Sequence, residues 1–115
     1  MQTPLQIVFD GLERSEALEN SIREHMGKLE QFSERIISCR VSIEAEHRHH
    51  HRGRLHHVRI ALHVPKKELV VNHDQHDKQA HEDPFVAVRD AFSSMTRQLE
   101  DQERIDRGDI KKHAD

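Results

Sequence analysis

Apolar and polar residues alternate along the first part of the chain, over residues 3–10. This period of two predicts a half-buried β-strand. From Ser15 to about Phe32 the apolar residues instead recur every three or four positions, which predicts a helix with one apolar stripe. Ser15 is a favourable residue for the N-cap of that helix. The apolar positions are Leu5, Ile7 and Phe9 in the strand, and Leu18, Ile22, Met26, Leu29 and Phe32 in the helix.

Alternation returns over residues 37–45 and again over residues 57–64, so two further strands are expected there. A histidine-rich loop joins them. A tight turn over residues 65–68 leads into a short fourth strand over residues 69–73. The apolar positions of the second and third strands are Ile37, Cys39, Val41, Ile43, Ala45, Val58, Ile60, Leu62 and Val64.

A second helix is predicted to begin after Asp83, which is a good N-cap, with Pro84 at the first helical position. Its apolar residues follow a step of three or four through five positions. The stripe ends near Ile105, and residues 106–115 are expected to form a flexible tail. The stripe consists of Phe85, Val88, Phe92, Met95 and Leu99.

These elements predict one α+β domain over residues 1–105, in the order β-α-β-β-β-α. Each helix has one apolar stripe and each strand has one apolar face. The simplest arrangement is therefore two layers, with two helices packed on one face of a four-stranded sheet. The other face of the sheet is expected to be open and to carry Arg40, Ser42, Glu44, His57, Arg59 and His63.

Positive charge is concentrated in residues 47–67, which read HRHHHRGRLHHVRIALHVPKK. This stretch, here called the basic segment, has six Arg and Lys residues, no acidic residue and a formal charge of +6, against −3 for the whole chain. Arg and Lys without acidic neighbours attract phosphate groups through counterion release. A solvated loop is the competing interpretation. The segment alone therefore favours nucleic-acid contact and a solvated loop about equally.

Composition excludes several other classes of function. The chain has no Trp or Tyr and four Phe, so few aromatic side chains could stack on the bases of a single strand. No run approaches the ~20 apolar residues of a membrane span, and the first residues do not resemble a secretory signal. Cys39 is the single cysteine, so we expect a cytoplasmic protein without disulfides.

Metal binding and catalysis are the remaining alternatives. Seven of the 12 histidines lie in the basic segment and could hold a transition metal. Their spacing is not that of a specific zinc site, so exposed loop histidines are the better interpretation, and no cofactor is expected. Residues 73–83 are rich in His, Asp and Glu, but no nucleophile or phosphate-loop motif accompanies them. Cys39 falls on an apolar strand face and is expected to be a small core residue and not a nucleophile. We therefore expect no catalytic residues.

Three arginines of the second helix, Arg89, Arg97 and Arg104, lie within about 80° of one another around the helix axis. A stripe of phosphate contacts is one interpretation. Acidic residues interleave with them, so a mixed, solvated face is an equal alternative.

Three stretches together carry a resemblance to a known family. They are SEALENSIREHMGKLEQFSERIISCRVSIEA, HRHHHRGRLHHVRIALHVPKKELVV and HEDPFVAVRDAFSSMTRQLEDQ. Over residues 4–105 the chain resembles the ribosome hibernation-promoting factors and ribosome-associated translation inhibitors, also called sigma-54 modulation proteins. The resemblance implies a fold similar to double-stranded RNA-binding domains. It also implies a stress factor that binds the decoding region of the small ribosomal subunit, blocks mRNA and tRNA, and inhibits translation during hibernation.

The resemblance also implies which residues contact rRNA phosphates. We expect no membrane partner and no small-molecule substrate. Unlike the best-known short members, the chain is net acidic and has mixed helix faces, which shifts the expected contact toward the basic segment. A general double-stranded RNA-binding regulatory module and a His-rich, metal- or pH-responsive binding protein are the alternatives. The expected contacts are Arg23, Lys28, Arg40, Arg48, Arg52, Arg54, Arg59, Lys66, Lys67, Arg89 and Arg97.

Overall fold

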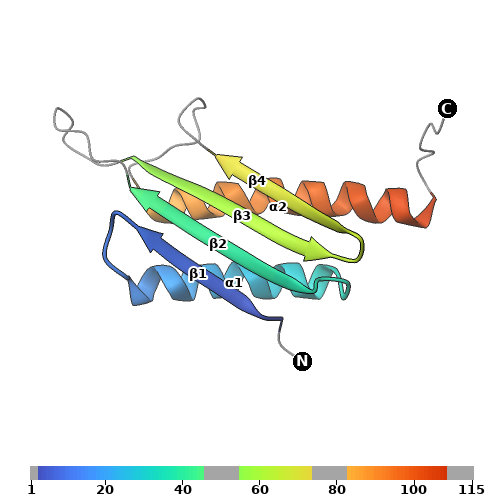
Figure 1. Cartoon of the computed structure of the whole chain (residues 1–115), viewed down its shortest axis with the longest axis horizontal. Helices are drawn as coiled ribbons and strands as arrows, with labels where there is room; N and C mark the ends of the chain where they lie inside the picture. The colour runs from blue at the N-terminus through green and yellow to red at the C-terminus, as the bar shows by residue number, and fades with distance from the viewer. Residues whose placement is uncertain (1–2, 46–54, 74–82, 109–115) are drawn as a thin grey trace.

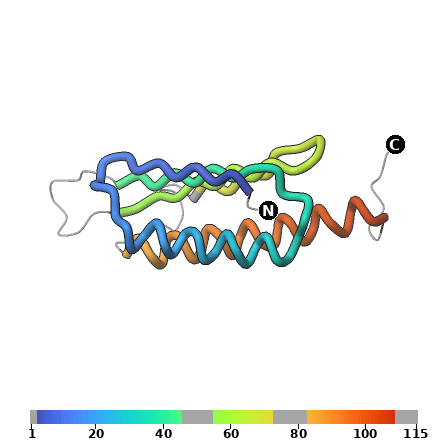
Figure 2. Tube along the Cα trace, turned by 90° about the horizontal axis from the view of Figure 1, so that it is seen from below, coloured from blue at the N-terminus to red at the C-terminus, as the bar shows by residue number. Residues whose placement is uncertain are grey.

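Four strands and two helices follow one another in the predicted order (Figure 1). The structure is a computed structural model that describes residues 3–45, 55–73 and 83–108. Both helices lie on one side of the sheet, which confirms the two-layer α+β fold (Figure 2). The elements are β1 (Leu5–Asp10), α1 (Glu16–Phe32), β2 (Ser38–Ala45), β3 (His56–Val64), β4 (Lys67–His73) and α2 (Pro84–Arg107).

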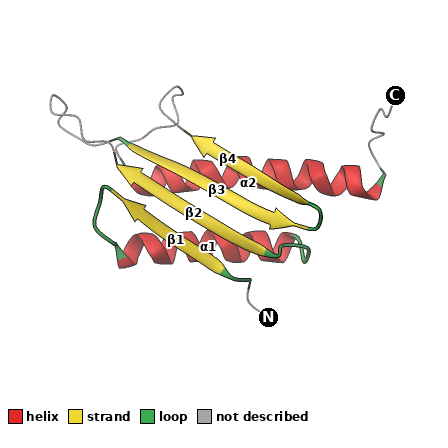
Figure 3. Cartoon of the chain, viewed as in Figure 1, coloured by secondary structure: helices red, strands yellow, loops and turns green. Residues whose placement is uncertain are grey.

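The strands lie in the sheet in sequence order, β1-β2-β3-β4 (Figure 3). β1 and β2 are parallel because α1 carries the chain back along the sheet between them. β2 pairs with β3, and β3 with β4, in antiparallel register. The Cα trace measures 50 × 35 × 18 Å, so the domain is a plate with one helical side and one open sheet side.

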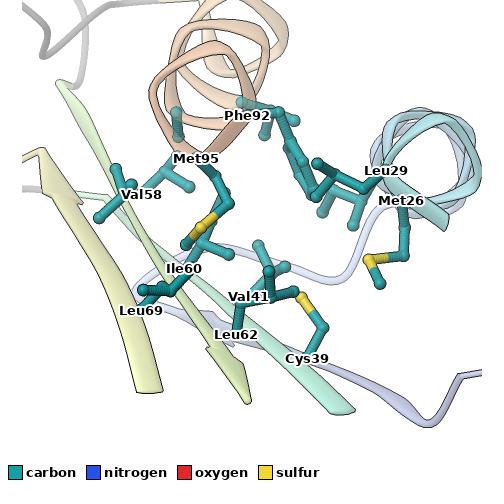
Figure 4. Packing of buried hydrophobic residues seen from close by; sticks show 14 of the residues in the cluster. Met26, Leu29, Cys39, Val41, Val58, Ile60, Leu62, Leu69, Phe92 and Met95 are labelled. Carbon is teal, nitrogen blue, oxygen red and sulfur yellow. The ribbon is translucent and has the colours of Figure 1, made fainter. Parts of the chain in front are cut away.

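The core lies between the sheet and the two helices (Figure 4). The inward-facing residues of β2 and β3 are almost completely buried, as the alternating pattern predicts. Cys39 belongs to this core and is 3% exposed. Burial raises the pKa of its thiol to about 12, so the group stays protonated near neutral pH. Cys39 is therefore a core residue, as predicted from its place on the strand.

The ends of the helices follow from their capping residues. The Ser15 hydroxyl accepts a hydrogen bond from the Leu18 backbone N–H at 3.2 Å. The Asp83 carboxylate accepts one from the Phe85 backbone N–H at 2.9 Å. α2 ends at Gly108, whose φ of 85° is the left-handed conformation that glycine adopts at little cost. The helix thus continues to Arg107, two residues beyond the predicted limit at 105, and residues 109–115 lie outside the described part.

Three apolar residues that were predicted to face the core are instead exposed. Phe32 is 45% exposed at the last position of α1, and Phe85 is 42% exposed in the first turn of α2. Ile37 is 50% exposed, whereas its neighbour Ile36 is 9% exposed and joins the core. β2 begins only at Ser38, so the residue before it does not follow the alternation of the strand. The corrections fall at the ends of elements, where periodicity is a weak guide.

Two histidines correct the prediction in the opposite direction. His56 and His57 were expected to be exposed, in the loop and on the open sheet face, yet each is only 8% exposed. β3 begins at His56, which pairs with Ala45, while His57 pairs with Glu44. His56 and His57 are therefore buried strand residues and not part of an exposed histidine cluster.

Candidate nucleic-acid interface

The expected contact residues fall on different sides of the plate. Lys28, Arg89 and Arg97 project from the helices, and we call them the helix surface. Arg40 and Arg59 lie on the open face of the sheet, and we call them the sheet surface. The remaining described residues are Arg23, Lys66 and Lys67, whereas Arg48, Arg52 and Arg54 lie outside the described part of the chain.

The helix surface is organised around the contact between α1 and α2. The imidazole of His25 on α1 stacks on the ring of Phe92 on α2, with ring centroids 5.3 Å apart and an interplanar angle of 15°. Burial lowers the pKa of His25, and the positive charges of Lys28 and Arg89 lower it further, against an opposing effect of Glu24. Lys28 and Arg89 therefore bring positive charge from two helices to the same seam.

Not every cation of the helices is available to a ligand. The Arg89 guanidinium lies 3.1 Å from the Asp90 carboxylate, and Arg104 pairs with Asp101. Lys28 and Arg97 form no ion pair or side-chain hydrogen bond with any residue in the described part of the chain. Arg104 thus fits the mixed, solvated interpretation, while Lys28 and Arg97 are the strongest candidates for phosphate contact on this side.

Arg23 lies apart from the helix surface. On an α-helix it is about 140° away from Lys28 around the axis. It lines a small cavity of about 110 Å³ between β1 and α1, together with Thr3, Leu5, Met26 and Glu30. The fold therefore points Arg23 toward the free edge of β1, and a ligand that covers Lys28 and Arg97 would reach it only by wrapping around α1.

The sheet surface brings two arginines together across a pair of strands. Ser42 is the partner of Arg59 in the register of β2 and β3, so Arg40, two residues before Ser42, is a diagonal neighbour of Arg59. Both arginines are exposed, and neither forms an ion pair or side-chain hydrogen bond within the described residues. Two shallow cavities of about 400 and 410 Å³ lie on this face, and both arginines line each of them.

The described part of the basic segment is spread along the sheet. Its described residues run the whole length of β3, from buried His56 to the turn at Lys66. Lys66 has a φ of 70°, a conformation that is uncommon for residues with a side chain. The ammonium of Lys67 donates a hydrogen bond to the side-chain oxygen of Gln102 on α2 at 2.9 Å. The turn from β3 to β4, which contains Lys66 and is followed by Lys67, therefore lies at the opposite end of the sheet from the end of β2 and the start of β3 (Figure 1).

A comparison with family profiles shows which protein family this chain belongs to. The profile described as sigma 54 modulation protein / S30EA ribosomal protein matches residues 5–105. The chain belongs to this family. Sigma 54 modulation / S30EA proteins are ribosome-associated factors, and the family is not a known class of enzyme. The recognition made from the sequence is confirmed, because the match spans every helix and strand up to the end of the apolar stripe of α2.

Solved structures show the same fold at low sequence identity. A ribosomal subunit interface protein from Coxiella burnetii is 13% identical, with a TM-score of 0.67 over 88% of this chain and 98% of that one. The N-terminal domain of Protein Y from Thermus thermophilus is 11% identical, with a TM-score of 0.62 over 85% of this chain and 96% of that one. No curated protein sequence gives a significant match.

Other kinds of site find no support in the parts of the chain that the structure covers. Within residues 3–45, 55–73 and 83–108, no three His, Cys, Asp or Glu side chains come close enough to hold a metal ion. None of the helices described is long and apolar enough to span a membrane. His49, His50 and His51 lie outside these ranges, so the metal alternative for them stays a prediction.

Sequence reasoning missed His25, which lies beside Lys28 and Arg89 in the described part of the interface. It directly precedes Met26 of the apolar stripe and therefore lies at the border of the buried face. A polar aromatic residue at that border can contact a neighbouring helix, which is the signal that could have identified it.

The burial of His25 predicts a pH effect on stability. Its folded-state pKa lies below the unfolded value, so the folded chain binds fewer protons at this site. The stability penalty is absent above the unfolded pKa of ~6.5 and grows as the pH falls below it. When the pH falls from 7.5 to 5.5, the melting temperature of a His25→Gln variant should therefore decrease less than that of the wild type. Equal losses in thermal unfolding would show that His25 titrates as it does in the unfolded chain.

Proposed function

We propose that this member of the sigma 54 modulation / S30EA family binds the decoding region of the small ribosomal subunit. There it blocks the access of mRNA and tRNA, and so inhibits translation during ribosome hibernation. The match to the family over residues 5–105 is the observation that carries this proposal. Both sides of the plate carry cations that form no ion pair within the described residues, which gives the proposal a physical basis because such cations can neutralise rRNA phosphates. The protein acts in the cytoplasm by occupying a site, and it catalyses no reaction there.

The proposed rRNA contacts differ in how well the structure supports them. Lys28, Arg97, Arg40 and Arg59 are exposed and form no ion pair within the described residues, so phosphate can replace solvent at little cost. Arg89 and Lys67 would first exchange a protein partner for phosphate. The further proposed contacts are Arg23, Arg48, Arg52, Arg54 and Lys66.

Sedimentation through a sucrose gradient tests the proposal. Purified protein is mixed with isolated ribosomes at low salt, and each fraction is probed for the protein. We expect it to travel with the small-subunit and whole-ribosome peaks, and to be released as the salt concentration rises. Addition of excess duplex RNA separates the two RNA-binding alternatives. A general double-stranded RNA-binding module would leave the ribosome for the duplex, and a protein that stays at the top of the gradient would overturn the proposal.

A further inference from the structure

The cations that have no ion-pair partner among residues 3–45, 55–73 and 83–108 lie on two sides of the plate that face in opposite directions. Lys28 and Arg97 belong to the helix surface, and Arg40 and Arg59 to the sheet surface. The core separates the two layers, and the Cα trace is 18 Å across its thinnest dimension (Figure 2). One straight RNA helix that lies against either side cannot touch the other side.

We infer that the sheet surface is a second phosphate-binding site and that the protein holds two RNA segments at once, one on each side of the plate. The inference rests on the proposed function and adds the way in which RNA is bound. It applies to Arg40 and Arg59 together, because their diagonal placement on β2 and β3 lets both guanidinium groups approach the same stretch of backbone.

The neighbours of the two arginines favour phosphate over other ligands. A guanidinium group presents a planar fork of donors that matches two phosphate oxygens. Gln6 and Ala61 are the register partners of Arg40, and Ser42 and Asn72 are those of Arg59, so every direct cross-strand neighbour is uncharged. The open face has no aromatic residue on β1 or β2, and β3 places His57 and His63 in the lining of the two cavities. The two guanidinium groups and their uncharged neighbours therefore suit the site to the sugar-phosphate backbone.

Acidic residues limit the direction in which RNA can cross this face. Asp10 and Glu44 are register partners near one end of the sheet, and Glu68 pairs with His63 near the other end. Arg40 and Arg59 lie between these two acidic rows. An RNA backbone that runs along the strands would meet carboxylates at both ends, whereas one that crosses the strands would meet only the positive middle. We therefore expect the bound segment to cross β2 and β3 at Arg40 and Arg59, between the cavity that Glu68 lines and the cavity that Asp10 and Glu44 line.

Two matched variants test this inference. The double variant Arg40→Gln, Arg59→Gln removes two positive charges from the sheet surface. The double variant Lys28→Gln, Arg97→Gln removes two positive charges from the helix surface. All four side chains are exposed, so both variants should melt close to the wild type. The probe is one short RNA hairpin, prepared once with a donor fluorophore and once with an acceptor. Energy transfer reports two hairpins on one particle, and native mass spectrometry counts the protein and RNA chains.

We expect wild-type protein to form complexes of one protein with two hairpins and to give energy transfer. Each variant should bind one hairpin and lose the energy transfer. The sheet variant should still sediment with ribosomes at low salt. The slope of log affinity against log salt concentration, here called the salt slope, should be smaller in magnitude by about two units. A wild type that binds only one hairpin, a sheet variant that still binds two, or complexes with two proteins would overturn the inference. If the wild type does not sediment with ribosomes, the proposed function fails instead, and the count of hairpins then stands as a separate result.

Discussion

Replacement of Phe92 by Ala should lower the free energy of unfolding by about 3–5 kcal/mol. Phe92 is 3% exposed and lies where α2 faces α1 above the sheet (Figure 4). Truncation would leave a cavity in the core and would also remove the stacking contact with His25. A domain of this size is typically stable by only ~5–15 kcal/mol, so the loss is a large fraction of the total.

Phe85 on the same helix is a matched control for this prediction. It is the same residue type but is 42% exposed, so Phe85→Ala should cost much less. Chemical denaturation of both variants, with the slope against denaturant compared to the wild type, measures the two costs. If both substitutions cost the same, or if Phe92→Ala costs less than about 1 kcal/mol, α2 does not pack on the domain as described.

The sequence predicts the fold well because one simple rule places most of its residues. Alternation along β2 and β3 and the three-four step along α1 and α2 each assign a buried face, and the four faces can only be covered by one another. Cys39, Val88 and Met95 lie in the core as expected for this reason. The rule weakens where an element ends, which explains why Phe32 and Phe85 are exposed.

The arrangement of the candidate site was harder to predict than the fold. The sequence places Arg59, Lys66 and Lys67 in one charged segment, but the extended strand spreads them along the sheet. The register that pairs His57 with Glu44 joins residues distant in sequence, and no local pattern records it. The stacking of His25 on Phe92 likewise joins two helices that are far apart in sequence. Local periodicity identifies which residues face outward, whereas tertiary pairing decides which of them meet.

Substitution of the arginines of the basic segment should have a second large effect, on ribosome binding. Replacement of Arg48, Arg52, Arg54 and Arg59 by Ala should weaken ribosome binding and lower the salt slope by about four units, since each lost phosphate contact removes about one. The measurement is ribosome affinity at several salt concentrations, from the fraction of protein that sediments with ribosomes.

A control variant separates specific contact from the change in net charge. Replacement of Arg14, Arg35, Arg104 and Arg107 by Ala alters the charge by the same amount at positions outside the proposed interface. Arg14, Arg35 and Arg104 pair with the carboxylates of Glu19, Asp106 and Asp101 respectively, so the control should lower the slope little. Equal effects of the two variants would mean that net charge alone governs binding. An unchanged slope in the first variant, with Arg59 included, would remove the basic segment from the interface and leave the helix surface as the side that meets the ribosome.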